Sequence, residues 1–146
     1  MLGETRIRHW ATALLLLAVS VPSTFAQTSE IRVRVVDGRS GKPVRGGDLN
    51  VWTSPNQIAS NDIPLDRGGV AMIQLSHENT IRVFPGFDFF CGVRAPGSVG
   101  QEFSVDEVLR TGAATANGCG KANTAVKPGE IVVYVRPLTF WEAMRL

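Results

Sequence analysis

The sequence predicts an all-β fold, an antiparallel sandwich with one or two short helices near the C-terminus. Three observations predict it. Apolar and polar residues alternate with period two in several short runs, of which residues 31–35 are the first. Turn-forming residues separate these runs at intervals typical of antiparallel sandwiches. Helical periodicity occurs in only two short places, both late in the chain.

The first 26 residues have the three parts of a secretory signal peptide. Arg6 and Arg8 make the start basic, an apolar run follows, and the small residues Thr24 and Ala26 mark a cleavage site. We expect cleavage after Ala26 and a secreted or periplasmic protein. The apolar run is shorter than the about 20 residues that cross a bilayer core, so we expect no stable membrane span after cleavage.

The rest of the chain, about 120 residues, is enough for one domain. We expect a sandwich domain over residues 27–137 and a short amphipathic helix over residues 138–146. The predicted strands share alternating polarity or a β-branched run. They are expected near residues 31–35, 49–53, 70–75, 81–83, 87–93 and 131–135, the last as a central strand.

The stretch between the first two strands, residues 35–47, reads VVDGRSGKPVRGG and has some likeness to a phosphate-binding loop. A Walker-type loop requires G-x-x-x-x-G-K followed by Ser or Thr. Here Val36 stands at the first glycine position and Pro43 follows Lys42. We therefore interpret the stretch as a turn. Lys42 and Arg45 keep its tip basic, so contact with an anion is a minor alternative.

Two capping boxes predict the helices. Ser104 and Glu107 begin the first, which Gly112 ends, and Thr139 and Glu142 begin the second. The second helix has an apolar side that could dock on a partner or a membrane surface. We favour the alternative, in which it packs on the domain, because so short a helix is unstable alone.

Residues 111–128 show no clear period, and loops this long are normally functional or pinned. Cys119 can pin this one through a structural disulfide to Cys91, because both cysteines lie in the exported part. A redox-active or metal-binding pair would need a C-x-x-C spacing or further ligands, and the sequence has neither.

Three stretches carry a resemblance to a known family. Residues 35–47, residues 66–70 (DRGGV) and residues 81–87 (IRVFPGF) are similar to the opening, second turn and closing strand of carboxypeptidase regulatory-like modules. Leu65 stands where that family prefers Thr. The resemblance covers residues 31–87. It implies a seven-stranded Greek-key sandwich of the prealbumin-like, transthyretin-like class, in a small exported bacterial protein, without catalysis of its own.

Enzymatic functions find little support in the sequence. The chain has two histidines, and His9 leaves with the signal peptide. A zinc peptidase needs more ligands than His77 supplies, and His77 beside Glu78 is typical of a solvated turn. We expect no catalytic residues, no cofactor and no metal site. An enzyme would instead require a polar pocket in which His77 meets a carboxylate.

Two sets of residues are candidates for binding. The first is aromatic and could stack on sugar rings or receive a partner protein, unless its members fill the core. The second set is basic and could form a stripe that binds an acidic polysaccharide, anionic lipid head groups or an acidic protein face. The alternative is that these charged side chains only keep the protein soluble and prevent pairing at the sheet edges. The sets are Phe84, Phe87, Phe89 and Phe90, and Arg32, Arg34, Arg82 and Arg136.

Net charge excludes one class of partner. The chain carries a formal charge of +2, and loss of the signal peptide leaves about +1, so we expect no nucleic-acid partner. The sequence therefore predicts an exported non-enzymatic binding or structural module that acts through protein contacts. The alternative is a carbohydrate-binding module that uses exposed aromatic residues.

Overall fold

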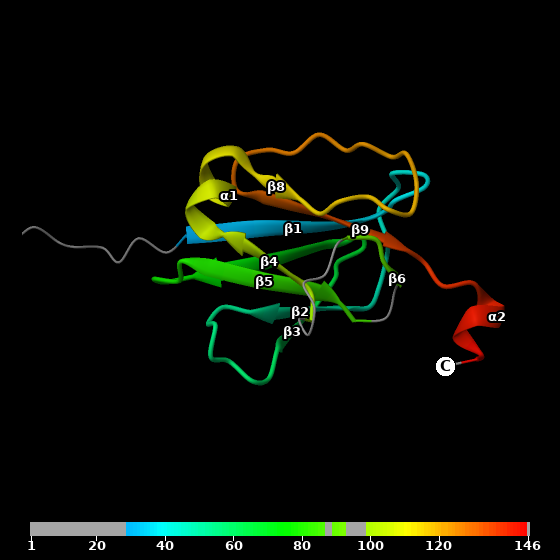
Figure 1. Ribbon diagram of the computed structural model, residues 1–146, viewed down its shortest axis with the longest axis horizontal. Helices are drawn as coiled ribbons and strands as arrows, with labels where there is room; N and C mark the ends of the chain where they lie inside the picture. The colour runs from blue at the N-terminus through cyan, green and yellow to red at the C-terminus, as the bar shows by residue number, and fades with distance from the viewer. Residues whose placement is uncertain (1–28, 87–88, 93–98, 146) are drawn as a thin grey trace, which may run out of the picture.

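The structure is a computed structural model and describes residues 29–86, 89–92 and 99–145. Two sheets pack face to face (Figure 1), one with the strand order β4-β1-β9-β6, where β8 also pairs with β9, and one with the order β3-β2-β5-β7. The elements are β1 (Ser29–Asp37), β2 (Asp48–Trp52), β3 (Asn61–Pro64), β4 (Val70–Leu75), β5 (Thr80–Pro85), β6 (Phe89–Phe90), β7 (Gln101–Ser104), α1 (Val105–Thr111), β8 (Ala113–Ala114), β9 (Glu130–Arg136) and α2 (Phe140–Ala143). The predicted signal peptide lies outside the described residues.

The main core lies between the two sheets and follows from the alternation in the sequence. On β1, Ile31, Val33 and Val35 are fully buried and Arg32 is exposed. Facing strands contribute their inward residues in the same way, for example Val51 and Val83. The predicted all-β sandwich is confirmed, because period two gives each strand one buried face.

The sheet that contains β1 is mixed and not purely antiparallel as expected. The first and last strands, β1 and β9, run parallel with Asp37 opposite Val135, and β8 is also parallel to β9. Side-chain alternation is the same in parallel and antiparallel strands, so it does not reveal direction. The structure describes nine strands where seven were expected. Strands β3, β7 and β8 are short and were not predicted.

A second buried cluster lies on the outer face of the same sheet. It consists of Val36, Cys91, Val132 and Tyr134. Residues 115–128, which we call the covering loop, pack over it through Cys119, Ala122 and Val126. The predicted disulfide joins Cys91 to Cys119. The loop without a period is therefore pinned, as expected, and it explains why β9 is buried on both faces.

Both predicted helices form. Ser104 caps α1 by accepting a hydrogen bond from the Glu107 amide, and Gly112 ends the helix at a φ of 75°. A Cβ at Gly112 would lie 2.2 Å from the Lys127 carbonyl oxygen, so this position requires glycine. In the described part of the chain, no helix has the length and apolar character needed to cross a membrane.

Candidate functional site

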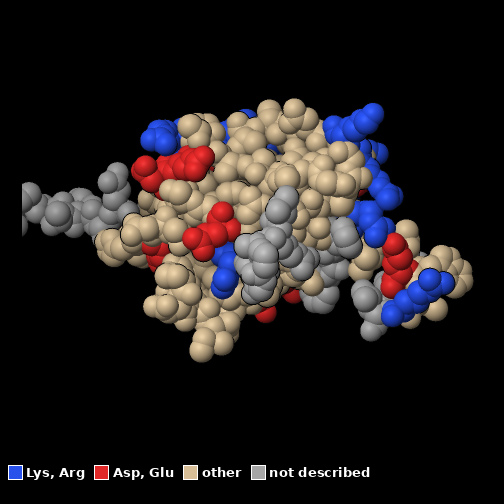
Figure 2. All heavy atoms as spheres, in the orientation of Figure 1, with Lys and Arg blue, Asp and Glu red and all other residues tan. Residues whose placement is uncertain are grey.

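Lys and Arg side chains gather at one end of the sandwich, whereas Asp and Glu side chains lie beside Lys and Arg at the other (Figure 2). Because β1 and β9 are parallel, the loop after β1 and the segment after β9 emerge at the same end. We call this the basic end and define it by four exposed residues, Arg39, Lys42, Arg45 and Lys121. Figure 2 shows Lys and Arg side chains gathered there. The sequence had marked only Lys42 and Arg45.

The loop between β1 and β2 forms the turn that the sequence predicted. The Asp37 carboxylate accepts hydrogen bonds from the Ser40 hydroxyl at 2.6 Å and the Arg39 amide at 3.0 Å. These bonds hold the pKa of Asp37 below its usual range, the Ser40 bond most of all. Gly41 turns the chain at a φ of 70°. The only carboxylate of this turn is thus engaged locally, and the cations of its tip stay exposed.

Lys121 reaches the basic end because the covering loop is tied to the β1–β2 loop. The Asn117 side chain donates a hydrogen bond to the Gly38 carbonyl at 2.7 Å, and the Ala122 amide donates to the same oxygen at 3.1 Å. The disulfide at Cys119 lies between these two contacts in the sequence. A spacing of 79 residues separates Asn117 from Gly38, so no local pattern indicates this pairing.

A shallow hollow of about 370 Å³ opens at the basic end. Residues 44–48 line one side, and Leu65, Pro85, Gly86 and Pro137 line the rest. Its wall is largely apolar, with the charges of Arg45 and Asp48 at its edge. Such a surface can receive an apolar side chain of a partner beside a cation. Its described lining residues include no set of groups for acid–base chemistry.

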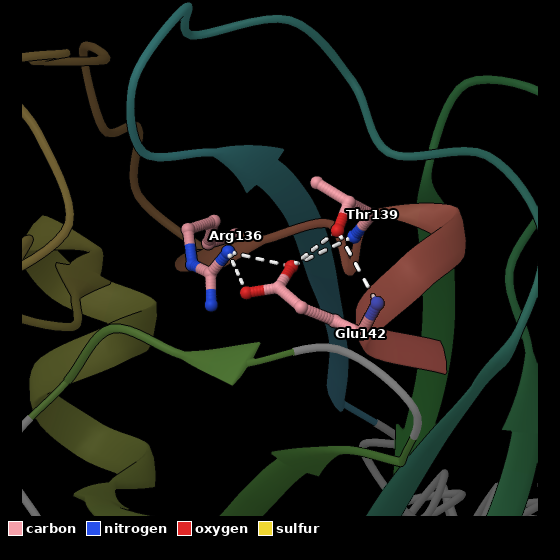
Figure 3. Close-up of polar contacts among 3 residues, drawn as sticks. All are labelled: Arg136, Thr139 and Glu142. Carbon is pink, nitrogen blue, oxygen red and sulfur yellow. Dashed lines mark hydrogen bonds and ion pairs between the residues drawn. The ribbon is translucent and has the colours of Figure 1, made fainter. Parts of the chain in front are cut away.

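Helix α2 extends from the same end and is tethered by polar contacts (Figure 3). Arg136 donates to both carboxylate oxygens of Glu142 at 2.9 Å, and the Thr139 amide and hydroxyl each donate to Glu142 at 2.9 Å. The Thr139 amide and hydroxyl, followed by Arg136, lower the pKa of Glu142 to about 2. The predicted capping box is therefore present and reciprocal.

Two side chains on the apolar side of α2 are largely exposed, and the packing of this helix on the domain stays a prediction. Trp141 is 70% exposed and Met144 is 64% exposed. The side chain of Phe140 lies outside the described residues, and the domain boundaries stay a prediction.

The opposite end carries Glu78, Asp106 and Glu107, which define what we call the acidic end. Strand β4 ends opposite the start of β1, so its turn into β5 lies at this end. The Val105 amide donates to the Asn79 carbonyl at 2.9 Å and ties this turn to the start of α1. Asp106 and Glu107 are exposed there, partly offset by Arg110 and Lys127 on the C-terminal side of α1.

Two shallow hollows flank the β4–β5 turn at the acidic end. One of about 340 Å³ lies toward α1, and one of about 490 Å³ lies between this turn and residues 53–55. His77 lines both hollows, yet within the described part of the chain its ring makes no hydrogen bond or ion pair. The Glu78 carboxylate accepts bonds from the Ser76 and His77 amides at 2.6 and 2.9 Å. Its own backbone amide, followed by those of Ser76 and His77, lowers the pKa of Glu78.

The four candidate arginines do not form one stripe. Arg32 and Arg34 lie on β1, and both contact Glu130, at 3.8 and 3.0 Å. Arg136 pairs with Glu142. Arg82 belongs to the other sheet, where its guanidinium lies 4.7 Å from the Trp52 ring centroid. The parity of a strand predicts which side chains face outward, but it does not reveal which sheet the strand joins.

The four candidate phenylalanines do not form an exposed platform within the described residues. Phe90 is buried, and its ring meets Phe84 edge to face with centroids 5.9 Å apart. Phe84 is half-buried against the main core. Phe87 and the side chain of Phe89 lie outside the described residues. A carbohydrate-binding role stays a prediction that now depends on these two residues.

Comparisons with known proteins give little further guidance. No family model matches the chain, and no curated protein matches it. Among solved structures, a DUF3823 family protein from Parabacteroides merdae is similar, with a TM-score of 0.41 and 13% sequence identity. The match covers 77% of this chain and 48% of that one, so the chain spans about half the length of that protein. Among the residues that the structure describes, no group of three or more His, Cys, Asp or Glu could hold a metal ion.

Proposed function

We propose that this protein is an exported, non-enzymatic binding or structural module that acts through protein contacts. The observation that carries the proposal is the basic end, where four exposed cations lie on two loops that hydrogen bonds hold together. A fixed positive surface steers an acidic partner toward it, which raises the association rate and the specificity of binding. The partner surface that suits this end is therefore an acidic face of a protein.

We further propose that the chain is a carboxypeptidase regulatory-like module with the prealbumin-like Greek-key arrangement. Strands β6 and β8 have two residues each. Without these two short strands, seven of the nine remain, which is the number that the resemblance implies. The count supports the assignment of β6 and β8 as additions to a family core.

Export is part of the proposal. The disulfide between Cys91 and Cys119 supports it, because such bonds persist in oxidising compartments. N-terminal sequencing of the secreted protein tests the proposed cleavage after Ala26. A mature chain that still contains Arg6 or Arg8 contradicts it.

Lack of catalysis is also part of the proposal. The carboxylates of Asp37 and Glu78 accept hydrogen bonds from backbone amides of their own turns. A carboxylate engaged in this way is a weak candidate for a general base, because the bonds favour its charged form. His77, the remaining histidine, is exposed on the β4–β5 turn.

Site-specific photo-crosslinking in the native host tests the proposed contact surface. A photoreactive amino acid replaces Lys42 or Lys121 at the basic end, and Met72, exposed on the outer face of β4, is the matched control. We expect positions 42 and 121 to crosslink to the same protein, and position 72 to give no such product. The double variant Arg39→Glu/Arg45→Glu should abolish both crosslinks. Equal products from all three positions contradict the proposal.

A further inference from the structure

We propose that the protein partner is a second copy of this chain, joined head to tail. The basic end of one copy, with its projecting α2, binds the acidic end of the next copy. This inference rests on the proposed function and names the partner of the same surface. Three features support it: opposite charge at the two ends, the exposed apolar side of α2 at one end, which we call the knob, and a hollow at the other end.

The charge of the two ends is complementary. Arg39, Lys42 and Lys121 are exposed on the basic end. Asp106 and Glu107 are exposed on the acidic end, where Arg110 and Lys127 offset them only in part. Like ends repel each other, so charge disfavours a symmetric dimer and favours contact between unlike ends. Charge alone gives a weak contact that salt screens, because the Debye length falls from about 30 Å at 0.01 M to about 3 Å at 1 M.

The knob is the exposed side of α2. Trp141 and Met144 are 70% and 64% exposed, an unusual state for side chains of this size. The tether from Arg136 to Glu142 holds this helix at the basic end. Trp is among the residues that contribute most to protein interfaces, and a buried Trp removes about 150–250 Å² from water.

The hollow that receives this side of α2 is the larger of the two at the acidic end, with a volume of about 490 Å³. Thr53, Ser54 and Pro55 form one wall and the β4–β5 turn forms the other. This wall offers apolar surface and backbone beside the Glu78 carboxylate. Ile58, on the same β2–β3 connection, is 98% exposed and adds an apolar side chain at this end. An indole ring entering here places the cations of its own copy near the acidic side chains.

The two surfaces lie at opposite ends of the strands, which decides the form of the assembly. A contact between unlike surfaces leaves one free basic end and one free acidic end on every assembly. Growth therefore continues in a line unless the rotation between copies closes a ring. The proposal predicts a series of oligomers and not a single dimer.

Sedimentation velocity of the exported, disulfide-bonded chain tests the proposal. We expect the average mass to rise with concentration at an ionic strength of about 0.01 M and to return to the monomer at about 1 M. Trp141→Ala should weaken association by about tenfold or more. Met72→Ala, which removes an exposed apolar side chain away from both ends, should leave association unchanged.

A mixing experiment identifies the two surfaces. Arg39→Glu/Lys42→Glu/Arg45→Glu/Lys121→Glu makes both ends acidic, and Asp106→Lys/Glu107→Lys makes both ends basic. We expect each variant to be monomeric alone and the equimolar mixture to associate. Circular dichroism and melting curves check that both variants fold. A mixture that stays monomeric, or wild type that stays monomeric at low salt, overturns the proposal.

Other binding partners of α2 would give results that differ from those of self-association. If α2 bound a membrane surface, monomeric wild type would bind vesicles that contain phosphatidylglycerol, and Trp141 would mediate this binding. Phosphatidylcholine vesicles are the control. Such binding by the monomer overturns the proposal. A crosslink from position 42 to a different protein also overturns it but leaves the proposed function intact. No crosslink at all, together with a monomer at low salt, contradicts both.

Discussion

Strand β9 separates two buried clusters that are built in different ways. Ile131, Val133 and Val135 face the main core between the sheets, whereas Val132 and Tyr134 face the second cluster beneath the covering loop. All five are at most 4% exposed. A second sheet closes the main core, while a loop with almost no regular structure closes the second. Burial on both faces of one strand can thus depend on periodic strands on one side and on a pinned loop on the other.

The contacts of the covering loop explain how an irregular segment can act as a cover. The Thr124 amide donates to the Tyr134 hydroxyl at 2.7 Å, and the Thr115 hydroxyl accepts from the Tyr134 amide at 2.9 Å. Arg34 donates to the Ala125 carbonyl at 3.0 Å. These bonds satisfy polar groups that a buried loop would otherwise leave without partners. The disulfide then fixes the loop covalently.

Of the changes predicted here to separate the two clusters, removal of the disulfide should lower the free energy of unfolding the most. Cys91→Ala/Cys119→Ala should lower the free energy of unfolding by about 3.5 kcal/mol, since the cysteines are 28 residues apart and the cross-link restricts the unfolded chain. Urea unfolding of the variant and of reduced wild type checks the value. Hydrogen exchange should rise first in the covering loop and leave Val33 and Val133 protected. A loss below about 1 kcal/mol would show that hydrogen bonds alone hold the cover.

Two neighbouring valines of β9 provide a matched pair for the next prediction. Val132 and Val133 are both fully buried, on opposite faces of the strand. Each change to Ala should cost about 2–3 kcal/mol in wild type, from lost burial and the cavity left behind. In the variant without the disulfide, the cost of Val132→Ala should fall to about half and that of Val133→Ala should persist. Equal costs in both backgrounds would mean that the two clusters are one cooperative core.

The sequence could predict the main core much better than the cover or the site. Alternation identifies Ile31, Val33 and Val35 because period two directly reflects burial on one face. Strand β3 reads NDIP and has a single aliphatic side chain, so its pairing with β2 leaves no periodic pattern. The pairing of β1 with β9 depends on contacts about a hundred residues apart, which propensity does not encode.

The candidate site shows the same limit. Lys42 and Arg45 could be assigned to a basic tip because they follow each other closely on one loop. Lys121 joins them through the contacts of Asn117 and Ala122 with Gly38, and Cys119 two residues away is the only sequence signal for it. The four arginines do not form one stripe, because Arg82 belongs to the other sheet.

The described side chains of helix α2 belong to neither cluster, which gives a prediction with a smaller effect. Trp141 and Met144 are largely exposed, so removal of residues 138–146 should lower the melting temperature by only about 1–3 °C. The same deletion should abolish the proposed self-association. Differential scanning calorimetry, with Val133→Ala as a control that melts clearly earlier, checks the first part. A fall as large as that of the control would mean that α2 packs on the sandwich in solution.

The tether of α2 should also respond to pH independently of both clusters. In the folded chain the pKa of Glu142 is about 2, below its ordinary value of 4.5, because Thr139 and Arg136 favour the charged carboxylate. The stabilisation is therefore fully present above about pH 4.5 and is lost as the pH falls through 2. A carbon-13 NMR titration of the Glu142 carboxyl should have its midpoint near 2 in wild type. In Thr139→Ala the midpoint should rise toward 4.5, while methyl signals of Val132 and Val133 stay unchanged. A wild-type midpoint near 4.5 would mean that the tether does not form in solution, and it would remove the support for a fixed knob at the basic end.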